Sequence, residues 1–437
     1  MVDNGVPDAD PDPFDSFRQF AALPGDVLVL SLAMFAFSLG FQATGRYLPQ
    51  YLAVLGASSL ALGAYGSIGN LISAVFPYPG GALSDRLGSR TSLTLFGVAS
   101  TLGFLVWWAA DPFRTVPVGP TNLAVVMIFL GLFLSQAWKS FGLGATFAVV
   151  KQSVPPDRLA SGFAATETFR RTAFLLGPLL VAGVLSVYAF TEGFRIVLLG
   201  AAVVGAVATV AQFLLYDASN DSIGKSFAGV SMVIEDLRSL PDTLGPLLVG
   251  DTLVRFANGM VYVFFVRVVV DVLAVGATIP VVVDLSPEAY FGVLLGIEMA
   301  VALATMVPVA RLARSVGLKP VVALGFAVYA VFPATLIFAP PDATVLAVLF
   351  AFSGLRFAGL PAHKALIVGP AEADAGGRVT GTYYLVRNVI TIPSALVGGW
   401  IYGRSPEVAF ALATVVGLVG VGYFLLRGRE FEAYASA

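Results

Sequence analysis

Basic side chains occur deep inside long apolar stretches of this sequence. Lys139, Arg171, Arg356, Arg387 and Arg46 each interrupt such a stretch. A Lys or Arg at the centre of a membrane-spanning helix costs about 2.5–3.5 kcal/mol on insertion scales, so several of them facing lipid would be prohibitive. We therefore expect these residues to face a shared interior space. A ring of positive charge around that space is suited to binding a small anion.

Carboxylates are scarcer in the same stretches, and two of them have a basic residue nearby in the sequence. Glu167 lies four residues before Arg171, and Asp251 lies four residues before Arg255. Residues four positions apart share one face of a helix, so each pair can form an ion pair. A purely structural ion pair and a functional role remain open for both.

Glu298 differs because it has no basic residue three or four positions away. A carboxyl group in low-dielectric surroundings without a local partner can bind and release a proton more readily near neutral pH. This makes Glu298 the first candidate for coupling to an ion, H⁺ or alternatively Na⁺, with Glu167 as the second. A static ion pair between Glu298 and a basic residue on another helix is the alternative.

The elements that must position these side chains are membrane-spanning helices. Of the 437 residues, 57% are hydrophobic and 12% are charged, whereas soluble domains contain about 25% charged residues. Apolar runs long enough to cross about 30 Å of hydrocarbon recur along the chain. We therefore predict an all-α integral membrane protein. The twelve predicted spans are residues 26–54, 59–83, 91–110, 122–150, 160–187, 195–216, 245–273, 289–310, 320–339, 343–368, 379–401 and 407–426.

Composition also excludes several classes of protein. The net charge of −2 gives no indication of a nucleic-acid partner. Without cysteine, and with His363 as the single histidine, thiolate and multi-histidine metal sites are impossible, and no cofactor is expected. Residues 219–226 are similar to a phosphate-binding loop, but Ser219 replaces its first glycine and no strand precedes it. The sequence contains no arrangement that indicates an enzyme.

The distribution of basic residues predicts the orientation in the membrane. If both termini are cytoplasmic, the cytoplasmic connections and tails carry thirteen Lys or Arg residues and the opposite side carries three. Cytoplasmic segments are enriched in Lys and Arg, so we expect a multi-pass protein of the cell membrane with both termini inside. The predicted organisation is a cytoplasmic acidic tail at 1–25, six helices at 26–216, a cytoplasmic linker with an amphipathic helix at 217–244, six helices at 245–427, and a cytoplasmic tail at 428–437.

The two predicted sets of six helices repeat each other in the same order. The segment from Lys139 to Asp157 aligns without a gap to the segment from Arg356 to Asp374, and Arg171 corresponds to Arg387. Two halves related by a pseudo-twofold axis along the membrane normal would bring both pairs towards one central space.

The stretch from Gly81 to Arg90 reads as a short charged turn between two apolar runs. It resembles the loop between helices two and three of Major Facilitator Superfamily transporters, G-x-L-[SA]-D-R-x-G-x-[RK]. The matching residues are Gly81, Leu83, Ser84, Asp85, Arg86, Gly88 and Arg90. A degenerate copy at 310–319 keeps Gly317 but has Arg314 in place of the acid.

This resemblance implies two pseudo-symmetric six-helix bundles around a central cavity. It also implies a monomeric secondary active transporter, in which a small solute crosses the lipid bilayer by alternating access. In the family, Asp85 would face the start of the eleventh helix, and Gly81, Arg86, Gly88 and Arg90 would complete a cytoplasmic gate. A proton-linked exporter of drugs or metabolites, and a non-transporting receptor on the same fold, remain alternatives.

Overall fold

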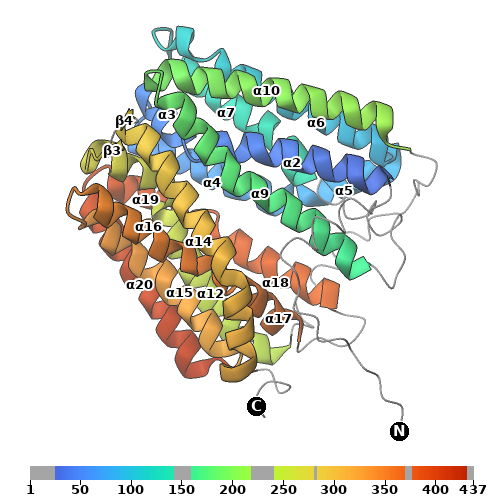
Figure 1. Cartoon of the computed structure of the whole chain (residues 1–437), viewed down its shortest axis with the longest axis vertical. Helices are drawn as coiled ribbons and strands as arrows, with labels where there is room; N and C mark the ends of the chain where they lie inside the picture. Colours follow the sequence, from blue (N-terminus) through green and yellow to red (C-terminus); the bar gives the residue numbers. More distant parts are fainter. Residues whose placement is uncertain (1–24, 142–158, 218–240, 280–282, 370–375, 431–437) are drawn as a thin grey trace.

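The computed structural model describes residues 25–141, 159–217, 241–279, 283–369 and 376–430 (Figure 1). The predicted N-terminal tail and most of the predicted linker, including its amphipathic helix, lie outside these residues. The end of the predicted span 122–150 also lies outside them.

Helices dominate the first half of the chain. Its elements are α2 (Gly25–Gly45), α3 (Leu48–Val54), α4 (Ser59–Val75), α5 (Pro77–Leu87), α6 (Ser89–Trp108), η1 (Asp111–Phe113), β1 (Pro117–Val118), β2 (Thr121–Asn122), α7 (Leu123–Gln136), the π-helical turn η2 (Ala137–Phe141), α9 (Leu159–Leu185) and α10 (Phe190–Leu215). Helix α2 packs against α9 and α10, and α6 packs against α7 and α10.

The second half follows a similar plan. Its elements are η5 (Asp242–Leu244), α12 (Gly245–Val261), η6 (Tyr262–Phe264), α13 (Phe265–Arg267), the π-helical turn η7 (Val268–Val272), β3 (Ala277–Ile279), β4 (Val283–Leu285), α14 (Pro287–Val316), α15 (Leu318–Ile337), α16 (Ala343–Ala358), α17 (Leu360–Val368), α18 (Gly376–Thr391), α19 (Ser394–Tyr402) and α20 (Pro406–Arg427). Helix α20 packs against α12 and α15, and α14 packs against α16. In Figure 1 the helices of the first half lie above those of the second.

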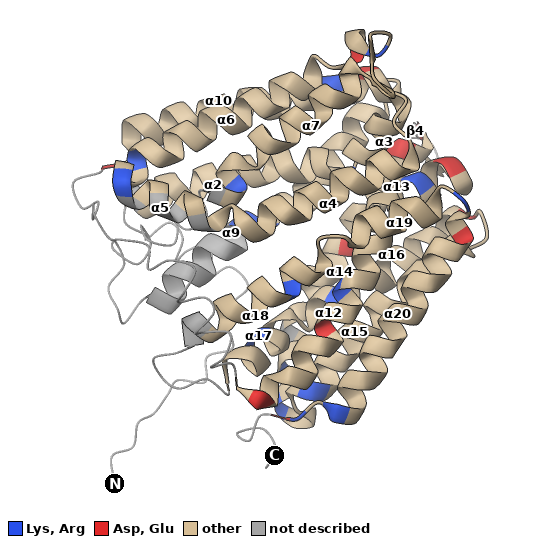
Figure 2. Cartoon of the chain, turned by 180° about the vertical axis from the view of Figure 1, so that it is seen from behind, with Lys and Arg blue, Asp and Glu red and all other residues tan. Residues whose placement is uncertain are grey.

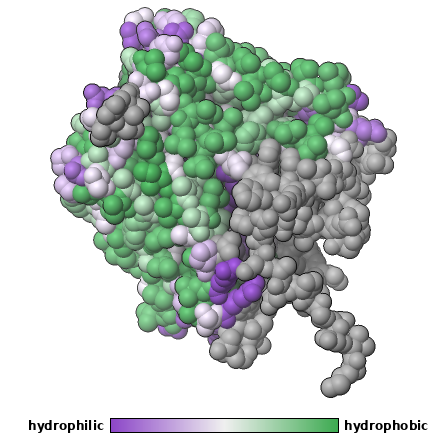
Figure 3. Space-filling view, viewed as in Figure 1, coloured by the Kyte–Doolittle hydropathy of each residue, from purple (hydrophilic) through white to green (hydrophobic). Residues whose placement is uncertain are grey.

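The surface of the molecule is that of a membrane protein. Nine helices in the described part of the chain are long and apolar enough to cross a bilayer. Many large apolar side chains point outwards, such as Leu214 and Leu426, and apolar residues cover much of the face seen in Figure 3. Charged residues lie mainly near helix ends, with a smaller group between the two halves (Figure 2). Lipid, unlike water, imposes no penalty on such a surface.

Several predicted spans are interrupted where continuous helices were expected. The span 26–54 breaks at Arg46 and Tyr47, and 59–83 breaks at Phe76, just before Pro77. The spans 343–368 and 379–401 break before Pro361 and at Pro393. Proline lacks a backbone N–H and fits best in the first turn of a helix, so a new helix starts beside a proline at each of these breaks. Pro178, Pro308 and Pro333 nevertheless lie inside the continuous helices α9, α14 and α15, so a proline alone does not determine a break.

Two short hairpins also depart from the all-α expectation. Strand β1 pairs with β2, and β3 pairs with β4 with Thr278 opposite Asp284; both ladders are antiparallel. Gly119 turns the first hairpin with a φ of +57°. Both hairpins lie in connections between helices, where backbone groups without helical partners can pair with each other.

The charged stretch at 81–90 is helical through Leu87, so the prediction of a turn there was wrong except at Gly88. Gly88 has φ +82° and ψ 155°, and Gly317 in the degenerate copy has φ +91° and ψ 167°. Glycine populates positive φ without the steric penalty of a side chain, so it separates two helices at both places. The shared geometry supports the repeat inferred from the sequence.

Among the described elements, the most extensive contacts between the two halves are those of α4 with α19 and of α9 with α14. A Cβ atom added at Gly63 would come within 2.4 Å of the Ala395 carbonyl oxygen, and one added at Gly292 within 2.7 Å of the Pro178 carbonyl oxygen. The Gln50 amide adds a 3.0 Å hydrogen bond to Asp271. Gln50 and Asp271 belong to the end of the molecule where α3 and the β3–β4 hairpin lie (Figure 1), so the halves are in contact at this end.

Candidate functional site

A cavity of about 500 Å³ lies between the two halves, with residues from both halves in its lining. Its charged lining residues are Arg46, Lys139, Arg255, Arg356 and Arg387. No aspartate or glutamate is among the described residues that line it. Four of these five cations were predicted to face a common cavity; Arg255 was expected only in an ion pair with Asp251.

Uncharged polar and aromatic side chains complete the lining. They include Gln42, Asn70, Gln136, Asn258, Asn388, Tyr65, Trp107, Tyr262, Phe291 and Tyr329. The Gln136 Oε1 and Asn258 Oδ1 atoms are buried and have no hydrogen-bond partner within the described part of the chain. Cavities that bind small molecules combine apolar walls with a few convergent polar groups, as this one does.

Glu298 on α14 lies behind one part of the cavity wall and is 2% exposed. It accepts hydrogen bonds from Arg46 Nη2 at 3.0 Å and from Arg356 Nη2 at 2.6 Å. The Ser353 hydroxyl donates a third at 2.5 Å. The expectation of a carboxylate without a fixed partner was wrong, because both arginines come from segments distant in the sequence. Of the two possibilities, the structure shows the ion pair between helices.

The pair between Arg46 and Glu298 crosses from one half of the molecule to the other. Arg46 lies at the break between α2 and α3, and its guanidinium also stacks on the ring of Tyr262 at 4.2 Å. Arg356 is on α16, one turn before that helix ends, and is itself 2% exposed. A buried carboxylate is stable only when its oxygens are well paired, and this arrangement pairs both.

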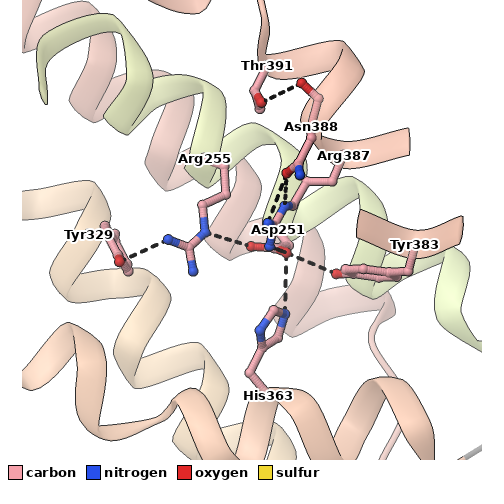
Figure 4. Close-up of polar contacts among 8 residues, drawn as sticks. All are labelled: Asp251, Arg255, Tyr329, His363, Tyr383, Arg387, Asn388 and Thr391. Atoms are coloured by element: carbon pink, nitrogen blue, oxygen red, sulfur yellow. Dashed lines mark hydrogen bonds and ion pairs between the residues drawn. The ribbon is translucent and has the colours of Figure 1, made fainter. Parts of the chain in front are cut away.

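Asp251 on α12 is the second buried carboxylate, with 0% exposure. Figure 4 shows it at the centre of side chains from three other helices. Arg387 Nη1 lies 3.0 Å away, the Tyr383 hydroxyl 3.2 Å away and His363 Nε2 3.3 Å away. The predicted pair with Arg255 is confirmed, with 3.3 Å between Arg255 Nε and Asp251 Oδ1.

The two arginines around Asp251 have further contacts. Arg255 Nη1 donates to the Tyr329 hydroxyl at 2.9 Å. Arg387 donates to Asn388 Oδ1 from Nε and Nη2 at 3.2 and 3.0 Å, and stacks on Tyr384 at 4.6 Å. These contacts fix both guanidinium groups at the cavity wall, where they can meet a ligand without reorganising.

Lys139 lies in the π-helical turn η2 that follows α7, and it is exposed to the cavity. Single π-turns inside helices often occur at functional sites. The neighbouring Trp138 anchors the turn. Its backbone N–H donates to Ser100 Oγ at 2.9 Å, and its indole ring stacks on Phe37 with 4.7 Å between ring centroids. No carboxylate in the described part of the chain pairs with Lys139.

The charges around the cavity do not balance. Five cations line it, and two carboxylates, Glu298 and Asp251, neutralise part of their charge from behind. Among the described residues, an excess of three positive charges therefore remains. Fixed cations in a partly desolvated space attract anions more strongly than the same groups would in water.

The remaining predicted residues lie elsewhere. Arg171 is not among the described lining residues, and its Nη1 lies 3.5 Å from the Met306 sulfur across the two halves. The surroundings of Gly81 and the side chains of Glu167 and Asp85 lie outside what the structure describes. Arg90 Nε donates to the Phe213 carbonyl at 2.8 Å, and its guanidinium stacks on that ring.

The described residues contain nine candidate membrane spans and a cavity between two halves of the molecule, which are features of a multi-pass membrane transporter. The family model for the Major Facilitator Superfamily matches residues 30–281. The chain belongs to that family.

Known proteins similar to this chain include transporters. An uncharacterised MFS-type transporter of Methanocaldococcus jannaschii is 21% identical over 410 residues, which cover 92% of this chain and 95% of that protein. A POT family transporter in complex with 5-aminolevulinic acid has a TM-score of 0.72 at 13% identity, covering 94% of this chain and 99% of its own. The nucleoside transporter NupG has a TM-score of 0.69 at 12% identity, covering 92% and 99%. At these identities the structures establish the fold.

Proposed function

We propose that this protein is a secondary active transporter that moves a small anionic solute across the membrane by alternating access. The observation that carries the proposal is the lining of the central cavity, with five cations and no carboxylate among its described residues. A solute with a carboxylate, sulfonate or phosphate group would satisfy the charge excess. Lys139 would be its first partner, because no described carboxylate competes for it.

The same observation argues against a carrier of cationic drugs. A cation in this cavity would meet fixed positive charges from both halves, and like charges at short range are repelled in surroundings of low dielectric constant. A non-transporting receptor would show no flux of solute and would tolerate substitutions in the cavity. Neither alternative accounts for a Lys139 that has no carboxylate partner among the described residues.

We further propose that the chain forms twelve spans in two six-helix bundles, at 26–216 and 245–427, with both termini cytoplasmic and the protein a monomer. The contacts between halves near α3 and the β3–β4 hairpin support a state closed at the outer face. The cavity would then open towards the cytoplasm. The motif at 81–90, with Asp85 as its acid, would close the cytoplasmic side in the opposite state.

Glu298 is the proposed site of coupling to H⁺ or Na⁺, with Glu167 as the second candidate. Proton uptake by Glu298 would remove the charge that attracts Arg46, and so would weaken an ion pair that joins the halves. The state of this one carboxyl group would thereby affect whether the halves stay together. Glu298→Gln should then lose the part of the dependence on a proton gradient that this carboxyl group carries.

The proposal is tested first by a ligand screen on the purified protein. Organic anions should raise its thermal stability, whereas organic cations of similar size should not, since a ligand stabilises only the state that it binds. In proteoliposomes, charge reversal by Lys139→Glu or Arg356→Glu should abolish uptake of the stabilising anion. Arg114→Glu, at an exposed position outside the cavity, is the matched control. Unchanged uptake in the Lys139 and Arg356 variants would refute an anion site in this cavity.

A further inference from the structure

His363 on α17 is the single histidine of the chain and is 4% exposed. Its Nε2 atom lies 3.3 Å from Asp251 Oδ2, and its ring packs edge-on against Phe326 and Tyr383 (Figure 4). Histidine is the side chain whose charge ordinarily changes between about pH 5 and 8. A buried histidine in contact with a carboxylate near a binding cavity therefore merits a functional explanation.

Asp251 is well paired even when His363 is neutral. Arg255, Arg387 and the Tyr383 hydroxyl all donate hydrogen bonds to its two oxygens. The histidine is therefore not needed to satisfy the carboxylate. Arg255 and Arg387 line the cavity, whereas Asp251 and His363 are absent from its described lining and lie behind them.

The other charged and titratable groups around His363 come from the neighbouring helices. A small cavity beside the imidazole is lined by Arg255 of α12, Tyr329 of α15 and Arg356 of α16. Tyr383 of α18 packs on the ring, and Lys364 follows on α17 itself but is exposed. Helix α14 also packs on α17 but contributes none of its described titratable side chains to this small cavity.

We propose that His363 is a proton-binding site whose protonation strengthens anion binding in the central cavity through Asp251. A charged imidazolium beside Asp251 compensates the carboxylate charge that otherwise offsets Arg255 and Arg387. The two arginines then present one more net positive charge to the cavity. This inference rests on the proposed anion site and adds the location of a proton site, separate from Glu298, and the sign of its effect.

A proton site that strengthens anion binding also determines the direction in which proton and anion move. If a proton at His363 tightens anion binding, then a bound anion must tighten proton binding by the same factor, because linkage between two sites is reciprocal. Proton and anion would then occupy the carrier together and move in the same direction. The mechanism requires only that His363 gain a proton; no bond other than N–H is formed.

The test measures anion affinity of the purified full-length protein from pH 5 to pH 8, the range in which histidine usually titrates. The probes are sulfate and benzenesulfonate, whose charges stay constant over that range. Affinity of the unmodified protein should increase at least about fivefold as the pH falls, the lower end of typical coupling between sites. His363→Gln should bind weakly at every pH, and His363→Lys, with a permanent charge, should bind tightly at pH 8.

Each outcome separates this inference from the proposal on which it rests. A pH dependence that persists in His363→Gln would overturn the role of His363. A pH dependence that disappears in Glu298→Gln but not in His363→Gln would move the proton site to Glu298 and leave the anion cavity intact. Absence of binding of either anion to the unmodified protein at every pH would instead contradict the proposed anion site itself. Proton uptake on anion binding, present in the unmodified protein and lost in His363→Gln, would support the inference independently.

Discussion

Two buried carboxylates stand behind the same cavity, and each is held by two of the arginines that line it. Glu298 pairs with Arg46 from the first half and Arg356 from the second. Asp251 draws all of its described partners from the second half, and these include a histidine. One cluster joins the halves, and the other lies within a single half. We infer that the two carboxylates have different roles. Glu298 affects whether the halves stay in contact, and Asp251 affects the net charge of the binding surface.

The sharpest test of this comparison is removal of each carboxylate. Asp251→Ala should leave two arginines near the cavity wall without their carboxylate, and breaking a buried pair in this way costs about 3–5 kcal/mol. Glu298→Ala should cost more, because its partners Arg46 and Arg356 are only 12% and 1% exposed. The arginines of Asp251 keep 16% and 24% exposure and can be solvated more easily. Thermal denaturation of both variants in detergent checks the order. Equal losses of stability would indicate that the two clusters are structurally equivalent.

The next test concerns Arg46, whose ion pair with Glu298 connects the two halves. Arg46→Gln should weaken the closed contact and increase the population with separated outer ends by about fivefold or more. Arg387→Gln removes an arginine from the cluster around Asp251, which lies within one half, and should leave that population unchanged. Since the chain has no cysteine, spin labels on Thr115→Cys and Pro341→Cys can report the distance between the two halves. A shift of equal size in both variants would remove the distinction between the clusters.

The smallest effects should come from the neutral donor in each cluster. Ser353→Ala removes one hydrogen bond to Glu298, and Tyr383→Phe removes one to Asp251. A hydrogen bond to a charged group is worth about 1.5–3 kcal/mol. Tyr383→Phe should fall at the low end, because Asp251 keeps three other partners. Melting temperatures of the two variants give the comparison, and a larger loss for Tyr383→Phe would contradict this ranking.

Much of the architecture could be predicted from the sequence, because the length of an apolar run and the charges that flank it are properties of neighbouring residues. Runs such as 320–339 differ by only two residues at each end from the helix observed, Leu318–Ile337. The cationic cavity was also accessible, since Lys139 and Arg356 occupy equivalent positions in the two repeats. Helix breaks at Pro77 and Pro393 were only partly predictable, because proline lacks the N–H that a helix uses, yet Pro178, Pro308 and Pro333 lie inside continuous helices.

The partners of the buried groups could not be predicted in the same way. Arg46 and Glu298 are 252 residues apart, and Asp251 and His363 meet only because α12 and α17 are brought together by the fold. Spacing along one helix identified the pair of Asp251 with Arg255 but gave no information about Tyr383 or Arg387. In the sequence, His363 indicated only that a single histidine is too few for a multi-histidine metal site. Its position beside a carboxylate required the structure.

The central claim is that the cavity binds an anion through its excess positive charge. The most direct measurement is the dissociation constant of benzenesulfonate for the purified protein, for Lys139→Gln and for the surface control Arg114→Gln. Loss of the Lys139 charge, which no described carboxylate pairs, should weaken binding by about tenfold, equivalent to about 1.4 kcal/mol, while the control should bind like the unmodified protein. Equal affinity for the unmodified protein and Lys139→Gln would contradict the account.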